Sequence, residues 1–337
     1  MKKNYVLVAA ALVLIFLIYS AVEMFIPLPF GNKPIEFEIK RGATFGQVVK
    51  ELSERGLVRD RWVIYVLGRA LGVDRRIKAG YYSLWGSMTP WQIFTAIRKG
   101  KIIEYEITVV PGDSLREIET KFTSLKITDS EEFQRLCTDT AFLQSLDVDA
   151  PSLEGYLFPD TYKFPKGLDA QDILIIMVNR LREQFDDGMM ARQMEIDIPE
   201  REVLTMASIV EKEAITDKER PIIAGVYYNR LKKRMLLQAD PTAIYGVKAS
   251  REKITRDDLL RKTPYNTYVI NGLPPGPIAS PGLRSIQAAL NPADVPYLYF
   301  VSNNDGTHNF SVTLSNHENA VRAYRYKKKS ASGRGAS

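Results

Sequence analysis

A stretch of 18 residues without a charge, Tyr5–Val22, constrains this chain more than any other feature. A helix needs about 20 mostly apolar residues to cross the hydrocarbon core of a bilayer, and this stretch is close to that length. Lys2 and Lys3 precede it, and basic flanks favour the cytoplasmic side. The sequence therefore predicts a single-pass anchor over residues 5–26 of a cytoplasmic (inner) membrane, with residues 1–4 inside and all later residues outside.

A cleaved signal peptide is the alternative for this segment. The apolar core of a signal peptide usually has about 7 to 15 residues and is followed by a small-x-small cleavage site. Here the uncharged run is longer and no clean site of that kind follows it, which favours an anchor. Outside the cytoplasm an enzyme meets no ATP and little nicotinamide cofactor, so we expect chemistry without a cofactor, on wall, lipid or imported material. Residues 27–36 are predicted to form a linker.

The net charge of +6 does not belong to the body of the chain. Residues 2–3 contribute +2 and the tail 327–337 contributes +4, which leaves residues 4–326 at net zero. Surfaces that follow a nucleic-acid backbone are strongly basic, so nucleic acid is not expected as a partner. The tail is poor in apolar residues and is predicted to be disordered.

Cysteine and histidine are scarce. Cys137 is the only cysteine, which excludes an intrachain disulfide. Together with His308 and His317 it is too small a set for most zinc sites, so no metal is predicted. Cys137 itself is expected to be a small buried hydrophobe on a helix with Phe133 and Leu136.

Two similar segments lie 70 residues apart, counted between their turn glycines Gly42 and Gly112. One is FEIKRGATFGQVVKEL from Phe37 and the other is ITVVPGDSLREIETKF from Ile107. Each shows alternating apolar residues, a glycine, a Thr or Ser suited to cap a helix, and then helical apolar spacing. Both segments therefore predict a strand, a turn and a helix.

Each copy resembles the first half of the LysM module, a small domain that binds N-acetylglucosamine polymers. The resemblance implies a LysM-like region over residues 37–150, although an ordinary β-turn-α unit has the same pattern. Between the copies, the apolar spacing predicts helices at Arg61–Leu71 and Thr89–Arg98, and a strand at Gly80–Leu84.

Residues 151–326 predict a catalytic region of mixed helices and strands, so the fold class is α+β. Apolar spacing indicates helices at Ala170–Phe185, Glu200–Ala214, Lys218–Lys233 and Leu283–Leu290. Two strands, Tyr297–Ser302 and Asn309–Leu314, flank an Asp-Gly turn and precede a terminal helix from Ser315.

The helix EVLTMASIVEKEA ends with two glutamates, Glu211 and Glu213. Helical geometry turns their side chains about 200° apart, so they do not share one site. Glu213 follows the bulky stripe of Met206, Ile209 and Val210. Apolar neighbours disfavour a charged carboxylate and raise its pKa, which suits a general acid near neutral pH. The alternative is that both glutamates are solvated at a frayed helix end.

The segments that follow combine amides, hydroxyls, aromatic rings and rigid turns. Such groups hydrogen-bond and stack on sugars, so they predict a glycan cleft, whereas turns joining helices are the alternative. The rigid turns are those of GLPPGPIASPG, Gly272–Gly282. The predicted substrate-binding residues are Gln238, Asp240, Tyr265, Asn266, Thr267 and Tyr268.

Five ordered motifs resemble the YceG-like family, the endolytic murein transglycosylases of bacteria. The motifs are ASIVEKE (Ala207–Glu213), LQADPTAIYG (Leu237–Gly246), YNTY (Tyr265–Tyr268), GLPPGPIASPG (Gly272–Gly282) and YLYFV (Tyr297–Val301). The resemblance covers about Phe37 to Tyr326. It implies that the second glutamate of the Glu-x-Glu motif, Glu213, is catalytic. Ala214 departs from the Thr of many relatives, next to that glutamate.

The resemblance implies cleavage of the β-1,4 bond between N-acetylmuramic acid and N-acetylglucosamine within a peptidoglycan strand, without water. Glu213 would protonate the bridging oxygen and then accept a proton from the muramoyl 6-hydroxyl, which closes a 1,6-anhydro ring. A muramidase-type hydrolase is the second hypothesis, and it needs a second carboxylate, Asp240 or Asp160. Glu211 and His308 are further secondary candidates.

A non-catalytic peptidoglycan-binding scaffold is the third hypothesis, since the LysM-like half alone would explain glycan binding. For the enzyme, the membrane anchor suggests that it cuts nascent strands and ends their elongation. The resemblance also implies penicillin-binding synthases as partners.

Overall fold

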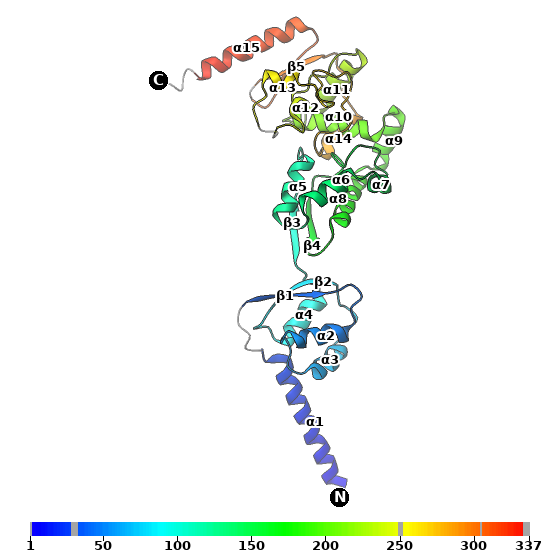
Figure 1. Ribbon diagram of the computed structural model, residues 1–337, viewed down its shortest axis with the longest axis vertical. Coiled ribbons are helices and arrows are strands. Elements are labelled where there is room, and N and C mark those ends of the chain that lie inside the picture. The colour runs from blue at the N-terminus through cyan, green and yellow to red at the C-terminus, as the bar shows by residue number, and fades with distance from the viewer. Residues whose placement is uncertain (1, 28–32, 249–251, 304, 333–337) are drawn as a thin grey trace. The chain divides into compact units, whose positions relative to one another are not determined.

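The computed structural model describes residues 2–27, 33–248, 252–303 and 305–332. The chain divides into two compact units (Figure 1). The first consists of Met1–Glu106 with Lys163–Leu168, and the second of Ile107–Tyr162 with Asp169–Ser337. Helices and strands occur in both units, which confirms the α+β class.

The first unit contains α1 (Lys2–Phe25), β1 (Pro34–Ile39), α2 (Phe45–Glu54), α3 (Arg61–Ala70), β2 (Gly80–Trp85) and α4 (Pro90–Lys99). The paired strands β3 (Glu104–Thr108) and β4 (Thr161–Pro165) have residues in both units. The second unit contains α5 (Leu115–Ser124), α6 (Ser130–Thr138), α7 (Thr140–Ser145), α8 (Ala170–Gln184), α9 (Asp187–Ile196), α10 (Glu200–Glu213), α11 (Arg220–Lys232), α12 (Asp240–Ile244), α13 (Arg256–Leu260), α14 (Leu283–Leu290), β5 (Tyr299–Ser302), β6 (His308–Ser311) and α15 (Leu314–Ser332).

Helix α1 is the predicted apolar segment. Its stretch Asn4–Phe25 has a mean hydropathy of 2.6, and only 6% of its most apolar window is buried by protein. An apolar helix of this length with little protein cover fits a single-pass membrane anchor. The linker predicted over residues 27–36 is shorter than expected, because β1 already begins at Pro34. Residues 28–32 of that linker lie outside the described residues.

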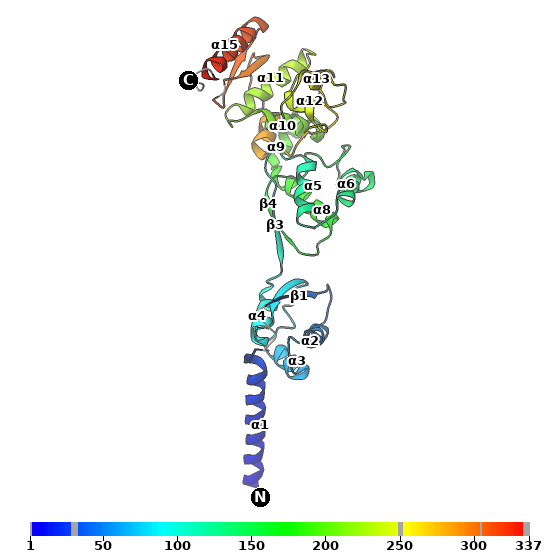
Figure 2. The same ribbon diagram turned by 60° about the vertical axis from the view of Figure 1, so that its left-hand side comes forward.

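The first unit is built around the antiparallel pair β1 and β2, in which Phe37 lies opposite Tyr82. Helices α2, α3 and α4 lie on one side of this pair (Figures 1 and 2). Phe37, Tyr82, Val49 and Ile93 are completely buried between the strands and the helices. Each such side chain stabilises the unit by about 1.5–3 kcal/mol through its removal from water.

The two copies of the repeat have the predicted local structure. Thr44 caps α2 and Ser114 caps α5, and each forms a capping box with the residue three positions later. Gly42 and Gly112 have φ angles of +79° and +89°, which residues with a Cβ rarely adopt. The copies belong to different units, so the region predicted over residues 37–150 is divided between them.

Helix α10 is the centre of the second unit. Every residue from Val203 to Val210 is buried, and the helix packs against α11, α12 and α14. A helix covered on all sides cannot move independently of its neighbours, so it is a rigid support for its last turn. The predicted strand pair is confirmed by β5 and β6, and Cys137 is buried as expected.

The C-terminal helix is longer than expected. Helix α15 continues to Ser332, so it includes residues 327–332 of the tail for which disorder is predicted. Lys, Ala and Arg are good helix formers, and no glycine or proline interrupts the helix before Gly333. Residues 333–337 lie outside the described residues.

Candidate active site

Glu213 ends α10 and is half-buried. The Tyr227 hydroxyl of α11 donates a hydrogen bond to its Oε1 at 3.3 Å, and the backbone N–H of Asp240 donates a second. Burial, followed by the negative charge of Asp240, raises the pKa of Glu213 to about 7. The two donated hydrogen bonds act in the opposite direction and keep the ionised form accessible. Such a carboxyl can hold or release a proton near neutral pH.

Glu211, two residues earlier, is held in a different environment. It forms an ion pair with Arg220 at 3.0 Å and accepts hydrogen bonds from the Gly282 N–H at 2.9 Å and the Ser285 hydroxyl at 2.8 Å. Its side chain is 7% exposed. Glu211 therefore attaches the loop before α14 to the end of α10. Both glutamates contact α11, but through different residues, Arg220 for Glu211 and Tyr227 for Glu213, in keeping with their separation around the helix.

The loop that carries Asp240 is fixed by a buried arginine. Arg230 of α11 donates through its guanidinium to the carbonyl oxygens of Leu237 at 2.8 Å and Leu298 at 2.7 Å. The Gln238 backbone is in the left-handed region with φ of +51°, and the exposed side chains of Gln238 and Asp240 lie at the start of α12. The arginine thus orders the segment that places Asp240 beside Glu213.

The YNTY segment divides into buried and accessible residues. Asn266 and Thr267 are completely buried. Asn266 donates to three backbone carbonyls, the nearest at 2.7 Å, while the Thr267 hydroxyl accepts from the Ala239 N–H at 2.9 Å. Tyr265 and Tyr268 are half-buried, and the Tyr268 hydroxyl donates to Asp240 Oδ1 at 2.5 Å. Asn266 and Thr267 shape the loop, whereas the two tyrosines keep accessible surface.

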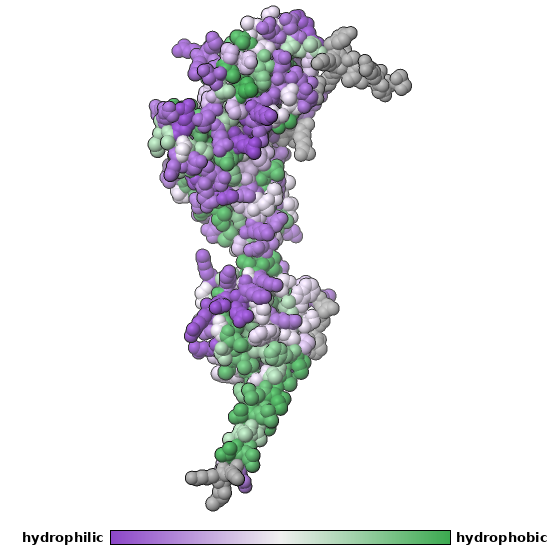
Figure 3. Space-filling model, turned by 180° about the vertical axis from the view of Figure 1, so that it is seen from behind, coloured by the Kyte–Doolittle hydropathy of each residue, from purple (hydrophilic) through white to green (hydrophobic). Residues whose placement is uncertain are grey.

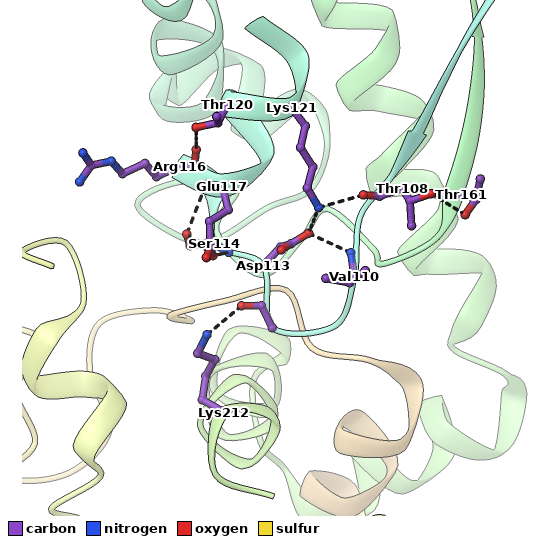
Figure 4. A network of polar contacts seen from close by, with 11 residues as sticks. Thr108, Val110, Asp113, Ser114, Arg116, Glu117, Thr120, Lys121, Thr161 and Lys212 are labelled. Atoms are coloured by element: carbon purple, nitrogen blue, oxygen red, sulfur yellow. Dashed lines mark hydrogen bonds and ion pairs between the residues drawn. The ribbon is translucent and has the colours of Figure 1, made fainter. Parts of the chain in front are cut away.

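The turn of the second repeat is attached to the same end of α10 (Figure 4). The Lys212 ammonium donates to the Gly112 carbonyl at 3.0 Å. The Gly112 N–H donates to the Ser280 carbonyl at 2.8 Å, and the Ser280 N–H donates back to the Asp113 carbonyl at 2.7 Å. Lys121 of α5 also bonds Asp113, which rigidifies the turn. The strand–turn–helix copy that ends in α5 is therefore part of the scaffold of the site.

Glu154 is a buried acid that is not among the site residues predicted from the sequence. It accepts hydrogen bonds from the Leu115 N–H at 3.0 Å and from the Tyr245 hydroxyl at 2.8 Å. Burial raises its pKa to about 7. Tyr245 follows α12 and its ring lies 4.6 Å from that of Tyr265. Glu154 thus connects the start of α5 to the loop of Asp240, and its place in the aromatic EGYLFPD segment was the only signal for it.

Two of the secondary candidates are occupied elsewhere. Asp160 forms an ion pair at 2.7 Å with Arg180 of α8 and accepts from the Thr161 N–H. His308 opens β6, and its Nδ1 lies 2.8 Å from Glu219 at the start of α11. Asp240, by contrast, acts on the pKa of Glu213, so it is the better placed of the two proposed second carboxylates.

The concave regions of the second unit include one that is separate from Glu213. A cavity of about 650 Å³ lies beside α9 and α14 and is lined by charged residues that include Arg192, Asp217 and Arg284. Glu213 does not line this cavity. The candidate site is therefore identified by the residues around Glu213 and not by this cavity. Among the described residues, no group of three or more His, Cys, Asp or Glu side chains is placed to hold a metal ion.

The chain belongs to the YceG-like family, whose sequence profile matches residues 37–323. An endolytic murein transglycosylase of Bacillus subtilis is 31% identical over 312 residues, which cover 86% of this chain and 84% of that protein. A protein of the same name from Streptococcus pneumoniae strain D39 is 27% identical over 81% of this chain, and the chain spans 55% of its length. A crystal structure of a yceG-like protein from Listeria monocytogenes has a TM-score of 0.60 at 30% identity, covering 85% of this chain and 98% of that one.

Proposed function

We propose that the chain is an endolytic lytic transglycosylase of peptidoglycan, with Glu213 as its catalytic acid and base. The observation that carries the proposal is the position of Glu213 at the end of a rigid helix, with its pKa raised to about 7 by burial and by Asp240. A carboxyl with a pKa near the working pH is suited to both donating and accepting a proton. The relatives named murein transglycosylases support the choice of substrate.

The bond cut is the β-1,4 linkage from N-acetylmuramic acid to N-acetylglucosamine. Neutral Glu213 donates its proton to the bridging oxygen, and the bond from that oxygen to the muramoyl anomeric carbon breaks. The Glu213 carboxylate then removes the proton of the muramoyl 6-hydroxyl, whose oxygen bonds to the same anomeric carbon and closes the 1,6-anhydro ring. The hydrogen bonds from Tyr227 and the Asp240 N–H stabilise the ionised intermediate state of Glu213.

The side chains near Glu213 divide the remaining tasks. Asp240, with its negative charge beside the acid, is suited to stabilise the oxocarbenium-like transition state. Gln238, Tyr265 and Tyr268 offer amide, ring and hydroxyl surface to the sugars, while buried Asn266 and Thr267 hold those residues in place.

A muramidase-type hydrolase is the second candidate, because Asp240 acts electrostatically on Glu213 as a second carboxylate would. The two reactions leave different products. Transglycosylation gives an anhydro end that is lighter by one water than the reducing end left by hydrolysis.

Mass spectrometry of purified glycan strands tests the proposal. The wild-type chain should yield internal fragments with anhydro-muramoyl ends, and Glu213→Gln should yield none. Fragments with reducing ends would assign the hydrolase instead. If Glu213→Gln cleaved as fast as the wild type, the site would be wrong, and if neither protein cleaved, the scaffold hypothesis would replace both enzymes.

We also propose that α1 anchors the enzyme in the cytoplasmic membrane with residues 1–4 inside, so that it cuts nascent strands close to where they emerge. Penicillin-binding synthases are the proposed partners, since they supply such strands. If a distant tether in place of α1 left the lengths of glycan strands unchanged in cells, the positional part of this proposal would fail while the chemical part stood.

A further inference from the structure

One face of the first unit carries exposed aromatic and apolar side chains beside the end of α1. Trp62 and Val66 lie one turn apart on α3 and are 73% and 54% exposed. Trp91, in the first turn of α4, is 37% exposed. With Phe25 and Ile26 at the end of α1, these residues form what we call the aromatic face. Exposed apolar surface of this kind marks a site of contact with another molecule or with lipid.

The last turns of α1 pack firmly against the first unit. Ser20, Glu23 and Met24 are buried, and their spacing places them on one side of the helix, toward α3 and α4. Residues 4–19 of α1 are exposed. Helix α1 is therefore attached to the unit directly, by its own side chains.

Two contacts place the aromatic face beside the last turns of α1. The Tyr19 hydroxyl donates to Asp60 at 3.0 Å, and Asp60 caps α3 only two residues before Trp62. The ring of Phe25 lies 5.8 Å from that of Trp91. Both tryptophans thus lie next to the C-terminal turns of α1.

The last turns of α1 would lie at the edge of a bilayer that α1 crosses. The 22-residue stretch Asn4–Phe25 is about 33 Å long as a helix, and the hydrocarbon core is about 30 Å thick. Tryptophan and tyrosine are enriched where the hydrocarbon core meets the headgroups. The apolar surface of α1 continues onto the adjoining surface of the first unit (Figure 3).

The charge of the unit is also suited to a lipid surface. Residues 33–106 carry 14 basic and 8 acidic side chains. Arg61 is exposed, and its guanidinium lies 6.0 Å from the centre of the Trp62 ring, which places a cation at the rim of the aromatic face. Basic side chains beside interfacial tryptophans attract anionic headgroups.

We propose that the aromatic face inserts into the interfacial layer of the membrane that α1 crosses. The first unit then binds the lipid surface through Trp62, Val66 and Trp91, and α1 is one part of a two-part membrane contact. The inference rests on the insertion of α1 and is independent of the chemistry of Glu213.

The three tryptophans of the chain allow a direct test with a matched control. Trp85, the third, is 40% exposed, close to the value for Trp91, but it ends β2 on the strand pair that lies away from α1 in both ribbon views. Two full-length variants isolate single reporters, W85F/W91F for Trp62 and W62F/W91F for Trp85. Phenylalanine at exposed positions keeps most of the ring and is not expected to disturb folding.

Each variant is reconstituted into vesicles of phosphatidylcholine and phosphatidylglycerol, with or without bromine on the acyl chains near the headgroup. Trp62 should lose roughly half of its fluorescence in the brominated vesicles, whereas Trp85 should keep nearly all of it. Alkaline carbonate extraction of the same vesicles reports separately whether α1 is inserted. The proposal would be overturned if Trp62 stayed unquenched in inserted protein, which is also the result expected if a second copy of the chain covered the face. Equal quenching of Trp62 and Trp85 would overturn it too.

Discussion

The two sides of the last turn of α10 treat a carboxylate in opposite ways. On one side, Glu211 has a cation, a hydroxyl and a backbone N–H as partners. On the other side, Glu213 is near the negative charge of Asp240, and its pKa is raised to about 7. The two residues share a helix and lie two positions apart, yet one holds a loop in place and the other is the proposed proton donor. The environment that tertiary packing supplies, rather than the residue type, assigns the role.

Replacing each glutamate by glutamine gives the largest expected contrast between the two sides. Glu213→Gln removes the proton that is transferred, and loss of general acid–base catalysis costs about 10²- to 10⁴-fold in rate. Glu211→Gln should cost much less in kcat, because the Glu211 carboxylate is already bound by Arg220, Gly282 and Ser285. The measurement is the rate of strand cleavage for both variants, with folding checked by circular dichroism. Equal losses in both variants would remove the distinction.

The two substitutions should affect stability in the opposite order, with Glu211→Gln losing more than Glu213→Gln. Glu211→Gln leaves Arg220 without one of its two ion-pair partners in a largely buried position, and breaking such a pair costs about 3 kcal/mol. Glu213→Gln removes no ion pair and should not reduce the free energy of unfolding. Urea denaturation of the soluble part at neutral pH compares the two. A Glu211→Gln protein as stable as the wild type would show that the ion pair does not hold the loop before α14.

The pH dependence of stability sharpens the contrast further. Burial and Asp240 raise the folded-state pKa of Glu213 to about 7, above the ordinary value of 4.5. Ionisation of Glu213 therefore opposes folding, and the contribution of its neutral form is fully present below pH 4.5 and is lost as the pH rises through about 7. Relative to Glu213→Gln, the wild type should lose about 2–3 kcal/mol between pH 5 and pH 8.

The comparison with Glu213→Gln cancels the titration of Glu154, which is present in both proteins. A difference between the Glu213→Gln and wild-type proteins that stays constant from pH 5 to pH 8 would contradict the raised pKa.

Much of the local structure could be predicted from the sequence, because it depends on residues close together in the chain. Helix α14 has the predicted bounds, and the caps of α2 and α5 follow from Thr44 and Ser114. The opposite directions of Glu211 and Glu213 follow from helical geometry alone. Their partners did not follow, because Arg220, Ser285 and Asp240 reach them only through packing of separate elements.

Two further features show the same limit. Asn266 and Thr267 have residue types suited to sugars, but their hydrogen bonds go to the protein backbone. Sequence cannot distinguish a buried amide that orders a loop from an exposed one that meets a ligand, because burial depends on distant residues. The repeat likewise predicts two similar βα segments. It does not predict that the second of them supports the end of α10.

A pair of glycine substitutions tests whether the turn at Gly112, which is bonded to the loop that Glu211 holds, affects cleavage. This pair has the smallest expected effect. Gly42→Ala and Gly112→Ala each place a Cβ at a positive φ, which costs about 1–2 kcal/mol. At Gly42 an added Cβ meets nothing within 4 Å, whereas at Gly112 it would lie 3.6 Å from the Lys212 side chain. The two strains are therefore similar, but Gly112 also donates a backbone hydrogen bond to Ser280, in the loop that Glu211 holds.

We therefore expect both alanine variants to lose similar stability and only Gly112→Ala to lower cleavage, by a few-fold, since strain in its turn is passed through Ser280 to the last turn of α10. Gly42→Ala is the matched control because it imposes the same backbone strain in the other copy. The measurement is kcat and KM on glycan strands, beside urea denaturation. If both variants cleaved like the wild type, the Gly112 turn would lie beside the site without affecting cleavage. The influence of Glu211 would then reach no further than the loop before α14.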